Sequence, residues 1–250
     1  MTPEEAKRLL ERSREQSWAF PSSFGDPGPP EAGMPGREEA VEATRVLLEA
    51  GEDQAATALA AVAWRLWMVH PRDVSGGRAF VSGVLEAADG EPARERALAL
   101  YGAGLLALRA GDREESRRWH EEALEAARAS GDAEALTLAH LGASREALED
   151  GDAEEARSHA VQAREHAEGL GPAFGQALLH MHAQALRLGG DLAGAAELFE
   201  ESLALNRRIG DRGMVVVELH NLGHVEIRGG GAEAAERYFE ELARTPVSLT

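Results

Sequence analysis

Histidine is the residue type in this chain that most invites a chemical role, since nine histidines occur among 250 residues that include no cysteine. His220 and His224 are four residues apart, so both project from one face of a helix. His180 lies forty residues before His220, a spacing that places it on a neighbouring helix if the chain repeats at that interval. Zinc would require the three imidazoles about 2 Å from one ion, with a fourth ligand such as Glu218 or Glu226.

Three interpretations of these histidines stay open: contacts in a binding groove, packing between helices, and a metal site at His180, His220 and His224. The sequence has no His-Glu-x-x-His or comparable motif to support the metal interpretation. We therefore expect these histidines to line a groove, and we predict no cofactor.

Other catalytic chemistry finds little support in the residue pattern. The absence of cysteine excludes a thiolate zinc site and a cysteine nucleophile. Serine, histidine and acid share no motif that is typical of hydrolases. Paired glutamates such as Glu114 and Glu115 stand at helical spacing from arginines, which favours a salt-bridged surface over an acid/base pair. The sequence thus predicts no enzyme, and an enzyme using groove histidines is the third hypothesis.

The charge balance restricts the partners. Forty-four acidic and 26 basic residues give a net charge of −18, which argues against nucleic acid and favours basic or mixed protein partners. No apolar run approaches the length of a membrane span, and we expect no secretory leader. With 44% hydrophobic residues the chain can bury a core, so a cytoplasmic folded protein is predicted.

The elements that must position these residues are repeated helical hairpins. Between regularly spaced breaks, apolar residues fall three and four apart, which is helical periodicity. A glycine after a last helical turn supplies the left-handed position, and an aspartate next to it can cap the following helix. Such glycine–aspartate pairs begin at Gly111, Gly131, Gly151, Gly190 and Gly210.

This rhythm predicts an all-α fold: a right-handed superhelical solenoid of about five helical hairpins with a forty-residue repeat. We expect an N-terminal helix in 1–20, a flexible Pro/Gly-rich linker in 21–37 and the repeat domain in 38–250. Within that domain, a helix over 38–50 precedes five hairpins at 53–88, 91–129, 132–169, 172–209 and 211–244.

Aligned repeats share small residues where two helices approach closely. In the first helix of each hairpin this column reads Gly104, Ser144, Ala183 and Gly223. In the second helix a small column reads Ser116, Ala156, Ala195 and Ala235, and a bulky-or-gap column four residues later reads His120, Ala160, Phe199 and Phe239. This pattern resembles the tetratricopeptide repeat in its forty-residue form.

A narrower resemblance covers roughly 38–244. The tryptophan-containing stretch 58–67, the segment 77–80 and the run 103–108 before Gly111 resemble the C-terminal helical-repeat region of ATP-dependent bacterial transcriptional regulators of the LuxR and AfsR types. The resemblance implies a module that senses a ligand or partner. The chain lacks a Gly-x-x-x-x-Gly-Lys-Ser/Thr loop, and Lys7 is its single lysine, so ATP hydrolysis and DNA binding are not carried over.

By analogy with tetratricopeptide proteins, the first-helix columns face a concave groove. The resulting candidates for partner binding are Tyr101, Leu105, Arg145, His180, Gln184, His220 and His224. On second helices, His120 is expected at the surface. Trp64 and Trp67 have two interpretations, a core that closes one end of the array and an aromatic platform for a ligand.

The C-terminal end suggests an interface. Repeat arrays normally end in a polar capping helix, yet Tyr238 and Phe239 are expected near the final edge. We predict that this edge, or the N-terminal helix with Trp18 and Phe20, is covered by a second copy or by a partner. The leading functional hypothesis is a scaffold or adaptor that binds a protein or peptide. The second is a stand-alone module that senses a small molecule.

Overall fold

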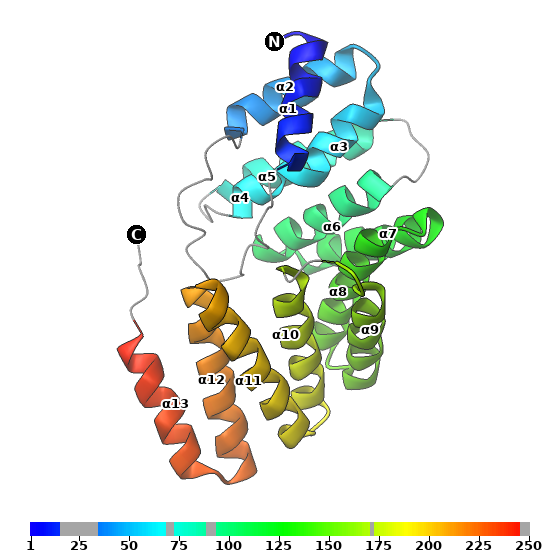
Figure 1. Cartoon of the computed structure of the whole chain (residues 1–250). Coiled ribbons are helices and arrows are strands. Elements are labelled where there is room, and N and C mark those ends of the chain that lie inside the picture. Colours follow the sequence, from blue (N-terminus) through cyan, green and yellow to red (C-terminus); the bar gives the residue numbers. More distant parts are fainter. Residues whose placement is uncertain (16–34, 69–72, 89–93, 171–172, 246–250) are drawn as a thin grey trace. The chain divides into compact units, whose positions relative to one another are not determined.

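The structure is a computed structural model that describes residues 1–15, 35–68, 73–88, 94–170 and 173–245. Helix is the only regular secondary structure in these ranges (Figure 1). The helices are α1 (Pro3–Glu15), α2 (Arg37–Glu49), α3 (Asp53–Ala63), α4 (Arg65–Met68), α5 (Val74–Ala87), α6 (Arg94–Arg109), α7 (Arg113–Ser130), α8 (Ala133–Asp150), α9 (Ala153–His166), α10 (Ala173–Leu188), α11 (Leu192–Ile209), α12 (Arg212–Gly229) and α13 (Ala232–Arg244).

The chain forms two compact units, and the division falls within α8, between residues 143 and 144. In the first unit α1 packs on α2 and α3, while α3 and α5 pack on α6, which pairs with α7. In the second unit each of α9 to α12 packs against the helix that follows it. The predicted all-α class and the packing of consecutive helices are confirmed.

The helix bounds agree with the predicted hairpins except at the first one. Its first half consists of α3 and the single-turn α4, which are separated at Trp64. Most of the predicted linker, together with Trp18 and Phe20, lies outside the described residues.

The turns between helices follow the predicted glycine–aspartate rule. Gly131 and Gly210 adopt φ angles of 65° and 81°, in the left-handed region that residues with a Cβ rarely enter. Asp211, directly after Gly210, accepts the backbone N–H of Met214 at 3.0 Å and so caps α12. The tight turns therefore arise from local sequence.

Close helix approach at the small column is also confirmed. A Cβ at Gly223 would overlap the ring of Phe239, and a Cβ at Gly104 would overlap the imidazole of His120. A Cβ at Gly142 would overlap the same imidazole. The predicted surface position of His120 is wrong, because its side chain fills this gap between helices and is only 1% exposed.

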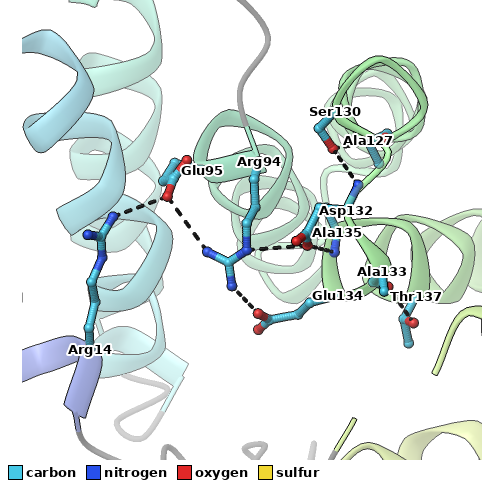
Figure 2. Close-up of polar contacts among 10 residues, drawn as sticks. All are labelled: Arg14, Arg94, Glu95, Ala127, Ser130, Asp132, Ala133, Glu134, Ala135 and Thr137. Atoms are coloured by element: carbon cyan, nitrogen blue, oxygen red, sulfur yellow. Dashed lines mark hydrogen bonds and ion pairs between the residues drawn. The ribbon is translucent and has the colours of Figure 1, made fainter. Parts of the chain in front are cut away.

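Ion pairs tie successive hairpins of the first unit together. Figure 2 shows Arg94, the first residue of α6, among the carboxylates of Glu95, Asp132 and Glu134. Its Nε lies 3.2 Å from Oδ1 of Asp132, the same oxygen that accepts a backbone N–H of the first turn of α8 at 2.9 Å. Arg14 of α1 contacts Glu95 at 3.1 Å. Arg94 thereby links α6 to the start of α8.

The same arrangement recurs at other capping aspartates. Arg78 of α5 donates to Asp112, the residue that caps α7, at 3.0 Å. Gln176 of α10 donates to Asp211, the residue that caps α12, at 3.0 Å. A polar side chain on one helix thus binds the capping acid of the corresponding helix one repeat later, which fixes the register between repeats.

Candidate functional site

The second unit carries a row of polar side chains on α10 and α12, which we call the α10/α12 face. On each helix the members are spaced by four and then by three or four residues, so they share one side. The face consists of His180, Gln184 and Arg187 on α10 and of His220, His224 and Arg228 on α12.

A buried carboxylate joins these two helices. Glu218 of α12 is 0% exposed, and its Oε1 accepts the hydroxyl of Ser202 at 2.6 Å and lies 3.0 Å from Nδ1 of His180. Its other oxygen accepts the side-chain amide of Asn221 at 3.3 Å. A buried carboxylate is stable only when hydrogen bonds replace its water shell, and these contacts supply them.

The buried carboxylate sets the orientation of the side chains above it. Because a carboxylate only accepts, Nδ1 of His180 is the donor in this contact, and its Nε2 faces Gln184. The amide nitrogen of Gln184 lies 3.4 Å from that Nε2, and its oxygen accepts Nε of Arg187 at 2.9 Å. This chain of contacts holds the Arg187 guanidinium at its Nε and does not use its two terminal nitrogens.

The histidines of α12 form a pair at the surface. Nε2 of His220 and Nε2 of His224 are 3.1 Å apart, and both residues are exposed. The ring of His224 also packs edge-on against Phe239, at 5.6 Å between centroids. The pair is therefore held against the last helix and remains accessible to solvent.

The local charge on this face is positive. Partial burial, with His224 and Arg187 nearby, lowers the pKa of His220. Burial, together with Arg228, lowers the pKa of Arg187. Within the described ranges, neither arginine forms an ion pair with a carboxylate, unlike Arg94 in the first unit. In a chain with a net charge of −18, this face is a local exception.

The structure does not bring the three predicted imidazoles to one point. His180 is bound to Glu218, whereas His220 and His224 contact each other. Across the described residues, no group of three or more His, Asp or Glu side chains is arranged to hold a metal ion. The metal interpretation thus lacks the geometry it requires.

Two predicted groove residues belong to the core instead. Tyr101 is 1% exposed and Leu105 is also buried, so neither offers an open surface. The ring of Tyr101 meets that of Trp64 edge-on at 6.0 Å, which covers this end of the column. Another predicted groove residue, Arg145, is partly buried, and its Nε lacks a hydrogen-bond partner.

The tryptophans are core residues, not a ligand platform. Trp64 is fully buried, and a Cβ at Gly102 would overlap its ring. Trp67 is buried as well and stacks on Phe80 at 4.7 Å. Their burial agrees with the interpretation of Trp64 and Trp67 as core residues.

The predicted edge residues pack within their own unit. Tyr238 and Phe239 are partly buried, and the Tyr238 hydroxyl donates to Glu200 at 2.7 Å. Burial and this hydrogen bond raise the pKa of Tyr238 to about 12. Coverage of the edge by a second copy stays a prediction.

A cavity of about 410 Å³ lies in the first unit, between α1, α3 and α6. Its lining includes several charged side chains, four of which form two ion pairs: Lys7 with Glu52 at 2.7 Å and Arg14 with Glu95 at 3.1 Å. Its size falls within the range of small-molecule sites.

Sequence reasoning missed the two arginines of the α10/α12 face. Arg187 follows Gln184 by three residues and Arg228 follows His224 by four, so helical spacing from the predicted set could have found them. None of the helices in the described ranges is long and apolar enough to cross a bilayer.

Comparison with known proteins shows the fold. No protein-family model matches the chain, and neither does any curated protein. Among solved structures, the chain is similar to the crystal structure of BtubC (BKLC) from P. vanneervenii, with a TM-score of 0.64 at 16% sequence identity. The similarity covers 83% of this chain and 90% of that one.

Proposed function

We propose that this chain is a non-enzymatic interaction scaffold or adaptor that binds a segment of another protein on the α10/α12 face. The observation that carries the proposal is the pair Arg187 and Arg228, which form no ion pair within the described residues although acidic side chains are abundant. Stacked helical hairpins leave extended faces of this kind, which commonly bind peptides or helices.

We also propose that the repeats are tetratricopeptide-like and that the protein acts in the cytoplasm. The contact of Phe239 on Gly223 supports the repeat assignment, because it places a bulky residue on a small one at the expected positions. The resemblance to the LuxR and AfsR regulators supports a regulatory role for the binding of a partner.

A stand-alone ligand-sensing module is the second candidate, and the cavity of the first unit favours it. Its charged lining would suit a small zwitterion that exchanges with the internal pairs of Lys7 and Arg14. A thermal-shift panel of small zwitterions would test this candidate separately.

The test of the scaffold proposal compares partners retained from the native cell by three versions of the full chain. His220→Ala/His224→Ala should lose the polypeptide that wild type retains, whereas His166→Ala, on α9, should keep it. Equal retention by all three versions, or retention of no polypeptide, would overturn the proposal.

A further inference from the structure

We infer that the α10/α12 face binds an acidic segment of a partner protein, with Arg187 and Arg228 pairing with its carboxylates and with the His220–His224 pair donating to it the one N–H that their mutual contact leaves free. The inference rests on the proposed function and specifies the chemistry of the partner. It also departs from the basic partner that the net charge of −18 suggests.

Geometry supports an anionic ligand first. The contact of Glu218 with His180 joins α12 to α10, and Arg228 lies close enough to Arg187 to act on its charge, so the arginines of the two helices belong to one surface. Arg187 is held at its Nε by Gln184, which leaves the terminal nitrogens for a carboxylate. A guanidinium that is already oriented loses less side-chain freedom when it binds.

The neighbouring charges point the same way. His224 and Arg187 both disfavour a positive charge on His220, and Arg228 disfavours the positive charge of Arg187. None of these neighbours is an acidic side chain. The carboxylate of the hydrogen-bond network, Glu218, is fully buried and already accepts hydrogen bonds from Ser202 and His180. An added carboxylate would relieve the repulsion between like charges.

The net charge of the chain does not prevent this binding. At 0.15 M salt the Debye length is about 8 Å, so charges beyond the face are largely screened. Eight residues of helix separate His220 from Arg228, which corresponds to about 12 Å at 1.5 Å per residue. Four extended residues of a peptide cover about the same length, so a short acidic segment can contact the whole of α12's row.

Fluorescence anisotropy with a labelled hexaglutamate peptide tests the inference on the full chain at 0.15 M salt. We expect saturable binding of hexaglutamate and none of hexalysine. Arg187→Gln/Arg228→Gln should weaken binding about tenfold, the combined effect of two partly exposed charge pairs. The matched control is Arg208→Gln, which removes an exposed arginine of α11 and should leave the affinity unchanged.

Several results would overturn the inference. These are absence of hexaglutamate binding, equal affinity in the double variant, and equal loss in the control. If free glutarate binds as tightly as the peptide, the ligand of this face is a small dicarboxylate and not a segment of a protein. If a native polypeptide binds the face but keeps its affinity for Arg187→Gln/Arg228→Gln, the acidic-segment inference fails while the scaffold proposal stands.

Discussion

Nδ1 of His180 lies 3.0 Å from Oε1 of Glu218, and this contact joins two helices one repeat apart. The carboxylate is fully buried while the imidazole reaches the surface of the same unit. A core interaction therefore determines which nitrogen of a surface histidine donates, and through Gln184 it positions Arg187. The candidate face is built on a buried polar centre.

Glu218→Gln should destabilise the protein by roughly 1–3 kcal/mol. The amide would present a donor where Ser202 and His180 now donate, which leaves a buried polar group unsatisfied. Urea denaturation followed by circular dichroism measures the change. Glu201→Gln, at an exposed position of α11, is the control and should stay within about 0.5 kcal/mol of wild type. An equal effect of the two changes would refute the role of the buried centre.

Gly223→Ala should destabilise the protein by roughly 1–3 kcal/mol through overpacking, because its Cβ would overlap the ring of Phe239. Gly229→Ala, in the same helix, meets nothing within 4 Å and should be neutral or stabilising. Thermal unfolding of both variants gives the comparison. Adding Phe239→Leu to Gly223→Ala should recover part of the loss, and no recovery would contradict the proposed contact.

Gly210→Ala should lower the stability by about 1 kcal/mol for a different reason. Its φ of 81° disfavours a Cβ, although open space surrounds the residue. Gly210→Asn should be milder, since asparagine tolerates the left-handed region better than alanine does. Chemical denaturation distinguishes the variants, and identical losses for alanine and asparagine would count against a backbone origin.

His220 should titrate below the ordinary histidine pKa of 6.5, because burial, His224 and Arg187 disfavour its protonated form. The unfolded chain then binds the proton more tightly, so this group reduces stability as the pH falls through about 6.5. NMR titration of the imidazole resonances should show the low pKa, and Arg187→Gln should raise it. A pKa unchanged by that substitution would mean that the guanidinium does not act on His220.

The turns and the close helix contacts were predictable because both follow from short-range rules. The glycine–aspartate pairs fix where helices end and begin, as Gly210 and Asp211 show. The small column marks close approach, as at Gly104 and Gly223. These features depend on residues at fixed offsets within a repeat.

The candidate face was predictable only in part. Repeat alignment grouped His180 and His220 in one column, but it treated Tyr101 as their equivalent although Trp64 covers that position. The buried centre joins Ser202 and Glu218 from different helices, and no local pattern marks such a contact. Unpaired arginines likewise become visible only when all the ion pairs are known.

Site-specific photocrosslinking tests the central claim, that this face binds a polypeptide, most directly. The crosslinking residue p-benzoylphenylalanine is placed at position 227 of α12, where exposed Ile227 lies between His224 and Arg228, and, in a matched protein, at exposed position 201 on α11. Irradiation in the native cell, followed by mass spectrometry, should give a polypeptide adduct at position 227 and none at position 201. Adducts of equal yield at both positions, or none at position 227, would contradict binding at this face.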